Sequence, residues 1–231
     1  MSDVNNDEDL HTAQPSSAKQ FKSKSRPHII TQDYPEKNYI RKPIRPGESS
    51  YSEAVKDGKL AYIFSTSITK GIRNREFDNY YNLGTARFRR FNGAKAKYVK
   101  HYVLPTLYEE KPQIVVLQCG GNDLPKSNAN PTPVMDIAKI IIETANLCES
   151  HGAEQILISG IITRHKGNYY MERRRTELNE ILRNICYDRG YIFIDNENIT
   201  HDNLSQDGVH LNHEGSDILA NNILHSLNNL Y

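Results

Sequence analysis

The chain has 231 residues, of which 37% are hydrophobic and 25% charged, an ordinary globular composition that can fill the core of one domain. The net charge of +1 excludes a global electrostatic attraction to nucleic acid or anionic membranes, and no apolar run is long enough to span a bilayer. The three cysteines match no zinc or redox spacing. We therefore expect a soluble protein without a disulfide framework, in a reducing intracellular compartment such as the cytoplasm.

The first 50 residues differ in composition from the rest of the chain. They hold five of the ten prolines, with scattered serine, lysine and aspartate and few clustered apolar residues. Such a segment cannot bury enough apolar surface to offset the loss of chain entropy on folding. We predict a disordered polar tail over residues 1–50 and a folded domain over residues 51–231.

Short apolar runs of strand length recur along the predicted domain. Runs that are apolar on both faces are typical of strands covered on both sides, as in a parallel sheet. Four such runs predict strands at Leu60–Phe64, Gln113–Leu117, Gln155–Ile158 and Tyr191–Ile194, and a short strand at about Ala86–Phe91 would complete five. Because helical patterns separate several of these runs, the sequence predicts α/β crossovers.

Apolar residues spaced three and four apart predict three longer helices in the second half of the chain. They run from Val134 to about Gly152, from about Tyr170 to Arg189 and from about Glu214 to Leu230. Gly152 can close the first of them, and Asn212 stands at the N-cap position of the last.

Hydroxyl- and glycine-containing segments follow the first three predicted strands. They are Ser65-Thr66-Ser67, Gly93 and Gly120-Gly121-Asn122-Asp123. In open parallel sheets, functional groups collect at the carboxyl ends of strands. A serine at the start of a helix lies among N–H groups that stabilise negative charge, glycines admit a ligand close to the backbone, and an asparagine amide can donate to an oxyanion. Taken singly, the serine is also typical of a helix N-cap, and the glycine-asparagine loop is typical of a turn.

The segment Asp207-Gly208-Val209-His210 follows the fifth predicted strand. An acid three residues before a histidine, across a glycine-containing turn, can accept the ring N–H, fix the tautomer and favour the imidazolium. His210 is therefore a candidate general base that Asp207 orients. The alternative is a loop histidine that lies beside a helix cap.

In their order and spacing, these four blocks resemble the SGNH hydrolase superfamily, also called the GDSL-type esterases and lipases. The resemblance covers about residues 58–230. It implies a three-layer α/β/α sandwich with a mostly parallel sheet of about five strands, of the SGNH or flavodoxin-like type.

The same resemblance implies a role for individual residues. Ser67 would be the nucleophile, His210 the base and Asp207 the orienting acid. The oxyanion hole would consist of the backbone N–H groups of Ser67 and Gly93 and the side chain of Asn122. No metal or organic cofactor would be needed.

The first block departs from the family pattern, which reads Gly-Asp-Ser where this chain has Ser65-Thr66-Ser67. A β-carbon at position 65 is expected to disturb the tight turn, and Thr66 lacks the charge of aspartate. A displacement of about 1 Å can cost on the order of a hundredfold in rate. We therefore predict an esterase-type hydrolase for small-molecule, lipid or carbohydrate esters, with a catalytically silent pseudoenzyme as the alternative.

A silent module could instead bind nucleic acid. Six basic residues between Arg87 and His101 alternate with Phe88, Phe91 and Tyr98, a mixture that suits phosphate neutralisation and base stacking. A solvated helix face with alkyl stems over the core is the alternative interpretation.

A metal site is the third hypothesis. Imidazole and carboxylate groups of the kind that bind zinc or manganese are clustered near the end of the chain, although their spacing fits no established signature. The candidate ligands are His201, Asp202, Asp207, His210 and His213. The sequence leaves the substrate and the oligomeric state open.

Overall fold

The computed structural model describes residues 58–124, 131–165 and 168–230. The predicted tail at residues 1–50 lies outside the described residues, so the tail and its boundary stay predictions.

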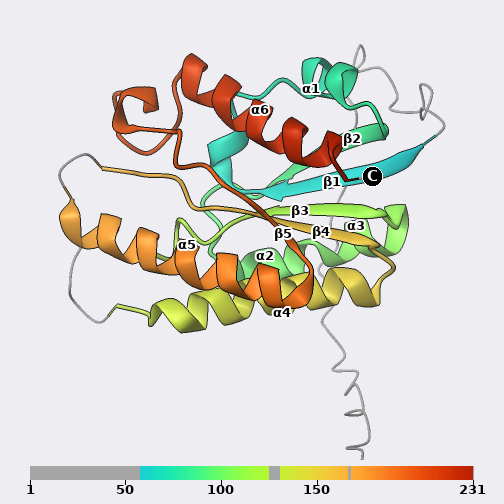
Figure 1. Ribbon diagram of the computed structural model, residues 1–231, viewed down its shortest axis with the longest axis horizontal. Coiled ribbons are helices and arrows are strands. Elements are labelled where there is room, and N and C mark those ends of the chain that lie inside the picture. The colour runs from blue at the N-terminus through green and yellow to red at the C-terminus, as the bar shows by residue number, and fades with distance from the viewer. Residues whose placement is uncertain (1–57, 125–130, 166–167, 231) are drawn as a thin grey trace, which may run out of the picture. The chain divides into compact units, whose positions relative to one another are not determined.

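Five parallel strands form one sheet in the order β2-β1-β3-β4-β5 (Figure 1). The strands are β1 (Lys59–Ser65), β2 (Gly84–Arg90), β3 (Ile114–Gln118), β4 (Gln155–Ser159) and β5 (Ile192–Ile194). All five predicted strands are therefore confirmed, with ends that differ by one or two residues. The strand order reverses between β1 and β3, where Ser65 pairs with Gln118. Loops at the carboxyl ends of strands on either side of such a reversal form the usual ligand crevice.

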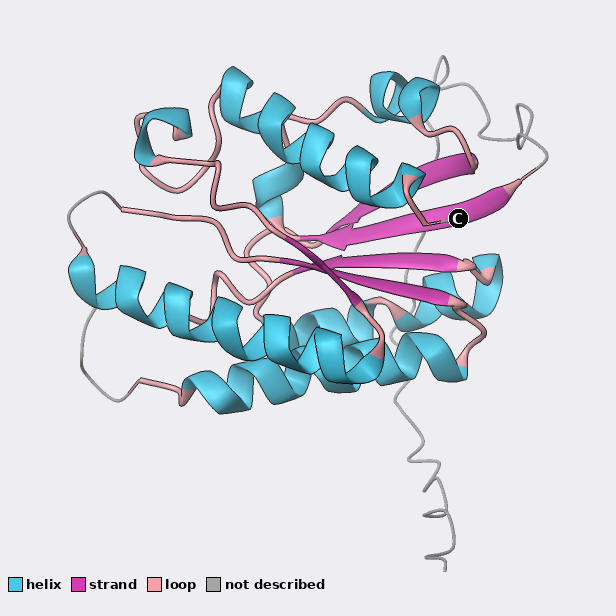
Figure 2. Ribbon diagram, viewed as in Figure 1, coloured by secondary structure: helices cyan, strands magenta, loops and turns pink. Residues whose placement is uncertain are grey.

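Helices cover both faces of the sheet, which confirms the α/β/α sandwich (Figure 2). The helices are α1 (Asn74–Tyr80), α2 (Ala96–Tyr102), α3 (Leu104–Glu110), α4 (Val134–Ser150), α5 (Tyr169–Arg189) and α6 (His213–Asn228). Helices α1 and α6 lie over one face, and the other four lie over the opposite face (Figure 1). None of the described helices is both long and apolar enough to cross a membrane.

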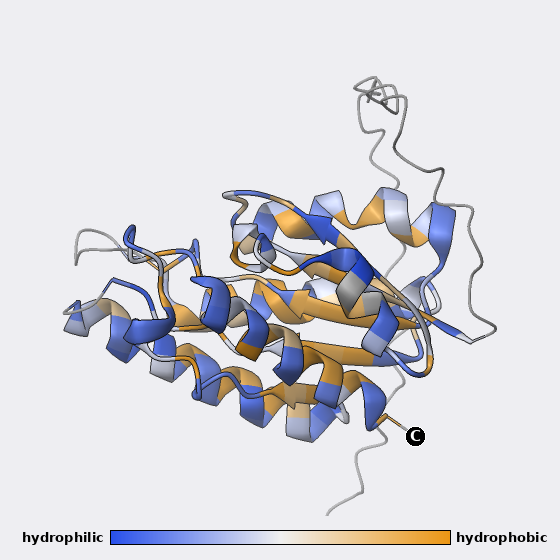
Figure 3. Ribbon diagram, turned by 90° about the horizontal axis from the view of Figure 1, so that it is seen from above, coloured by the Kyte–Doolittle hydropathy of each residue, from blue (hydrophilic) through white to orange (hydrophobic). Residues whose placement is uncertain are grey.

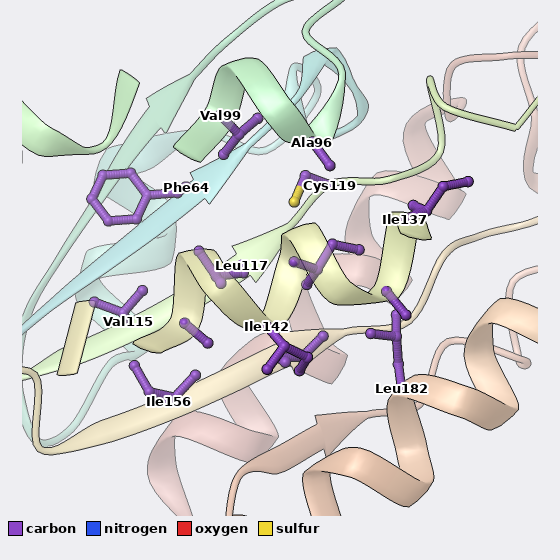
Figure 4. Packing of buried hydrophobic residues seen from close by; sticks show 14 of the residues in the cluster. Phe64, Ala96, Val99, Val115, Leu117, Cys119, Ile137, Ile142, Ile156 and Leu182 are labelled. Carbon is purple, nitrogen blue, oxygen red and sulfur yellow. The ribbon is translucent and has the colours of Figure 1, made fainter. Parts of the chain in front are cut away.

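Each face of the sheet has its own hydrophobic core, because successive side chains of a strand point to opposite sides. Phe64 of β1 packs with Leu117 and Ile137 in the core under α2, α4 and α5 (Figure 4). The neighbouring Ile63 packs with Leu219 of α6 in the other core. Strands β1, β3 and β4 are accordingly hydrophobic along most of their length, whereas the helices carry hydrophobic and hydrophilic stripes (Figure 3).

The predicted helix ends are confirmed by their hydrogen bonds. Gly152 has φ +97°, and its N–H donates to the Glu149 carbonyl at 2.9 Å as the chain leaves α4. The Asn212 side chain accepts from the Gly215 N–H at 2.8 Å, as an N-cap of α6 should. The Asn212 cap fixes where α6 begins, and therefore fixes the end of the turn that precedes it.

The three cysteines are buried free thiols in the core that Figure 4 shows in part. Burial raises the pKa of Cys119, Cys148 and Cys186 to about 12. Because a thiol nucleophile must ionise, none of them is suited to chemistry at neutral pH.

Candidate active site

Ser67 lies two residues beyond the last residue of β1, at the carboxyl edge of the sheet. It begins a short 3₁₀ helix, Ser67–Thr69, whereas the α-helix expected at this point begins later, at Asn74. Thr66 occupies the N-cap position and makes no side-chain cap bond, so the N-cap interpretation of Ser67 is wrong. The Ser67 hydroxyl instead lies 3.0 Å from Nε2 of His210.

His210 links Ser67 to Asp207. Its Nδ1 lies 2.6 Å from Oδ2 of Asp207, and its Nε2 faces Ser67 Oγ, so the three side chains form one hydrogen-bonded chain. The side chains of His210 and Asp207 are 40% and 50% exposed, which leaves the site open to solvent. The structure thus brings together two segments that are separated by 143 residues in the sequence.

The local turn prepares Asp207 for this contact. Its Oδ1 accepts hydrogen bonds from the backbone N–H groups of Val209 at 2.8 Å and His210 at 2.9 Å, and from the Ser205 hydroxyl at 2.8 Å. The bond from the His210 ring, followed by these backbone and hydroxyl bonds, lowers the pKa of Asp207 below its ordinary value. An ionised Asp207 can only accept, so it holds the hydrogen of the ring on Nδ1. The Nε2 lone pair is then available to take the Ser67 proton.

The Ser65-Thr66 turn is not strained. Ser65 is the last residue of β1, and Thr66 is extended, with φ −91° and ψ −164°. Among the described non-glycine residues, only Lys111 and His165 have a positive φ. The expected disturbance from a β-carbon at position 65 is therefore wrong, because this backbone conformation does not require glycine.

The Ser65 side chain has a structural contact. Its buried hydroxyl lies 2.6 Å from the Thr69 hydroxyl, which also accepts from Nε of Arg90 at 3.2 Å. Arg90 donates in addition to the Ile72 carbonyl at 2.9 Å. This network ties the 3₁₀ helix that begins at Ser67 to the end of β2.

Ser65→Ala is expected to lower the free energy of unfolding by about 1 kcal/mol, because the buried Ser65–Thr69 bond is lost. Ser65→Gly should lower it by a further ~0.5–1 kcal/mol, because glycine loses more chain entropy on folding. Urea denaturation measures both values. An alanine variant as stable as the unmutated protein would show that the hydroxyl pair contributes nothing.

The expected oxyanion donors lie on segments that are tied together. The Phe91 N–H donates to the Ser65 carbonyl at 2.8 Å, which places the turn containing Gly93 beside the Ser67 turn. Nδ2 of Asn122 donates to the Ala94 carbonyl at 3.0 Å, which brings the loop after β3 to the same turn. Gly93 has φ +71°, a backbone conformation that residues other than glycine rarely adopt.

The two glycines before Asn122 make room for protein atoms. A β-carbon on Gly120, which has φ +105°, would lie 3.0 Å from Cδ1 of Ile141. A β-carbon on Gly121 would lie 2.9 Å from Nη2 of Arg164. On the side where a β-carbon would point, a core side chain and an arginine therefore occupy the space that glycine leaves, and close approach of a ligand to this backbone stays a prediction.

Sequence reasoning missed Arg164. It is 6% exposed and donates from Nη1 to Oδ1 of Asn122 at 2.9 Å. Its signal was its place after the fourth strand, since charged residues just beyond an apolar run lie at the functional edge of a parallel sheet. Asp123, in contrast, has a structural contact: its Oδ2 accepts from the Ala96 N–H at 2.9 Å, and burial raises its pKa.

Ion pairs and hydrogen bonds within the described residues engage Arg87, Arg90 and Lys100 of the six predicted basic residues, and Lys97 lies over the Tyr98 ring. Arg87 pairs with Glu110 at 2.8 Å and Lys100 pairs with Glu143 at 2.8 Å, while Arg90 belongs to the network of the Ser67 turn. A cavity of about 320 Å³ beside β2 is lined by Arg87 and Glu110, and neither Ser67 nor His210 lines it. The nucleic-acid hypothesis stays a prediction.

The structure does not bring the five candidate metal ligands together. His201 contacts the Thr163 hydroxyl at 3.0 Å and His213 contacts Asp217 at 3.0 Å, whereas Asp207 and His210 contact each other and Ser67. Within residues 58–124, 131–165 and 168–230, no three His, Cys, Asp or Glu side chains form a group that could hold a metal ion.

Comparisons with known proteins agree with this architecture. The model of the GDSL-like Lipase/Acylhydrolase family matches residues 67–218, a range that begins at Ser67 and includes Asp207 and His210. No curated protein sequence matches the chain.

Solved structures of similar fold include several hydrolases. A GDSL-like lipase from Bacteroides thetaiotaomicron is 18% identical with a TM-score of 0.61, and the match covers 76% of this chain and 91% of that chain. A catalytic mutant of an acetylxylan esterase from Geobacillus stearothermophilus is 15% identical with a TM-score of 0.62, covering 74% and 94%. A lipase/acylhydrolase from Enterococcus faecalis is 16% identical with a TM-score of 0.61, covering 74% and 95%. At these identities the structures show a common fold.

Proposed function

Because the chain belongs to the GDSL-like lipase/acylhydrolase family, we propose that it is a serine esterase that hydrolyses esters through an acyl-enzyme on Ser67. The observation that carries the proposal is the hydrogen-bonded chain from Ser67 through His210 to Asp207, with contacts of 3.0 Å and 2.6 Å. Both contacts lie within the reach that proton transfer requires, in a structure without substrate.

In the acylation step, Ser67 Oγ attacks the ester carbonyl carbon while Nε2 of His210 takes the hydroxyl proton. The ionised Asp207 stabilises the imidazolium that forms. The carbonyl oxygen becomes an oxyanion, which accepts from the backbone N–H groups of Ser67 and Gly93 and from Nδ2 of Asn122. His210 then protonates the leaving alcohol, and the acyl group remains on Ser67.

Deacylation repeats the same steps with water. Nε2 of His210 takes a proton from the water as its oxygen attacks the acyl carbon, and the same donors hold the second oxyanion. Collapse of this intermediate releases the carboxylic acid and returns the proton to Ser67 Oγ. The residues in hand account for each proton in the cycle.

The exposure of the site supports esters that approach from solvent. His210 and Asp207 are about half-exposed, so the ester carbonyl needs no deep channel to reach Ser67. An acetylxylan esterase is among the proteins of similar fold, which supports short acyl groups on a carbohydrate alcohol as the first class to assay.

The second candidate function is a catalytically silent module. Thr66 favours it, because this buried residue stands where the family pattern has an aspartate. The unstrained turn and the 3.0 Å contact of Ser67 with His210 favour the enzyme. We therefore place the enzyme first.

The purified protein is expected to hydrolyse nitrophenyl acetate and butyrate and to react with a fluorophosphonate probe, because both reagents require a serine activated by its base. Nitrophenol release and in-gel fluorescence measure the two reactions, with heat-denatured protein as the control. Folded protein that neither labels nor turns over would leave the silent module as the better interpretation.

A further inference from the structure

Arg164 is a buried cation beside the proposed oxyanion hole. Only 6% of its surface is exposed, and its Nε makes no hydrogen bond within the described part of the chain. In the same residues, no carboxylate lies within 4.0 Å of its guanidinium. Burial lowers the pKa of Arg164, and the charge of Asp207, which lies beyond that distance, opposes this effect. A buried charge without a carboxylate in direct contact is costly, so its close contacts indicate its role.

Two contacts of the guanidinium are with the loop after β3. Nη1 donates to Oδ1 of Asn122 at 2.9 Å. A β-carbon on Gly121 would lie 2.9 Å from Nη2 and 3.0 Å from Cζ, so the guanidinium lies directly against the backbone of that glycine. Arg164 therefore fixes the loop that carries the third proposed oxyanion donor.

Two hydrogen bonds determine the orientation of the Asn122 amide. Its Oδ1 accepts from Arg164 and its Nδ2 donates to the Ala94 carbonyl at 3.0 Å. Because a guanidinium can only donate, the amide atom that faces Arg164 must be the oxygen. Nδ2 keeps a second hydrogen for a ligand, and the charged donor on Oδ1 polarises the amide so that this hydrogen is a stronger donor.

We propose that Arg164 is a positioning residue for ester hydrolysis, which orients the Asn122 amide and strengthens its donation to the developing oxyanion. This inference rests on the proposed function, since the Asn122 donor has a catalytic role only if an oxyanion forms at Ser67. A contact that strengthens as the oxyanion forms lowers the transition state more than the ground state. Loss of Arg164 should therefore reduce kcat and leave KM unchanged.

A double-mutant cycle on short-chain nitrophenyl esters tests the proposal. Arg164→Met should lower kcat roughly 10- to 100-fold, and Asn122→Ala should lower it roughly 100- to 1,000-fold. In the Asn122→Ala background, Arg164→Met should lower kcat by no more than about twofold, because the two residues act as one unit. Arg173→Met, which removes an exposed arginine from α5, is the matched control and should keep the unmutated kcat.

Gly121→Ala provides a second test that leaves Arg164 itself in place. The backbone at Gly121 is not left-handed, so the cost of alanine comes from its contact with the guanidinium. The displaced guanidinium should orient Asn122 poorly and lower kcat by roughly tenfold. This variant decides the question if urea denaturation shows that Arg164→Met does not fold.

Losses that multiply in the Arg164→Met/Asn122→Ala double variant would overturn the proposal, as would a folded Arg164→Met with the unmutated kcat. If Arg164→Met is unfolded, an unmutated kcat in Gly121→Ala overturns it. Unmutated protein without labelling or turnover would instead remove the proposed function, and this inference with it. The two failures are distinguished by the activity of the unmutated protein.

Discussion

Ser67→Ala is expected to lower kcat for ester hydrolysis by roughly 10⁴- to 10⁶-fold and to abolish fluorophosphonate labelling. Ser67 Oγ is the group that faces Nε2 of His210, at 3.0 Å, and alanine leaves the base without a nucleophile to deprotonate. The oxyanion donors remain, so the variant should still hydrolyse the ester somewhat faster than the uncatalysed reaction in water. Nitrophenol release at saturating substrate measures the change.

The loss must come from chemistry and not from unfolding. Ser67 lies at the half-buried start of a 3₁₀ helix, so its hydroxyl adds little to stability and the urea midpoint should stay near that of the unmutated protein. Ser226→Ala, which removes a hydroxyl from α6 that bonds only within its helix among the described contacts, is the matched control. Labelling that survives in Ser67→Ala would place the nucleophile elsewhere.

Much of the architecture was predictable because it depends on local patterns. The runs that form β1, β3 and β4 are apolar on both faces, because each strand contributes side chains to both cores. Such runs are typical of the central strands of a parallel sheet that is covered on both sides. The Asp207–His210 contact was predictable for the same reason: its residues are three apart in one turn.

The features that the sequence did not predict depend on conformation or on distant contacts. Residue type suggested strain at Ser65, but strain depends on φ, and Ser65 is extended within β1. The sequence places a glycine at position 121, but it does not tell whether a ligand or a side chain lies against it. That side chain, Arg164, is 43 residues away in the sequence, and only the pairing of β3 with β4 brings the two loops together.

The site is assembled from loops at the ends of all five strands. Ser67 follows β1, Gly93 follows β2, Asn122 follows β3, Arg164 follows β4 and His210 lies beyond β5. Individual hydrogen bonds join neighbouring loops, such as the bond from the Phe91 N–H to the Ser65 carbonyl. The positions of the atoms proposed to react thus depend on the register of the sheet, and a substitution that shifts one strand relative to its neighbour should lower kcat by displacing these atoms.

Asp207→Asn tests the orienting role of the acid with little change in shape. The asparagine Oδ1 can keep the two backbone bonds from Val209 and His210, because both donors face that atom. Its Nδ2 then replaces Oδ2 and donates to Nδ1 of His210, which moves the ring hydrogen to Nε2. Nε2 can no longer take the Ser67 proton, so kcat should fall by roughly 10³- to 10⁴-fold with KM unchanged.

Asp207→Ala separates this tautomer effect from the loss of bonds. Alanine removes all contacts of the carboxylate, so it should destabilise the turn more than asparagine does. It also frees the His210 ring to adopt either tautomer, so its kcat should be no lower than that of Asp207→Asn. Asp188→Asn, at an exposed acid of α5, is the matched control. If Asp207→Asn keeps more than a tenth of the unmutated kcat while alanine loses far more, Asp207 acts by supporting the turn, and the tautomer argument is wrong.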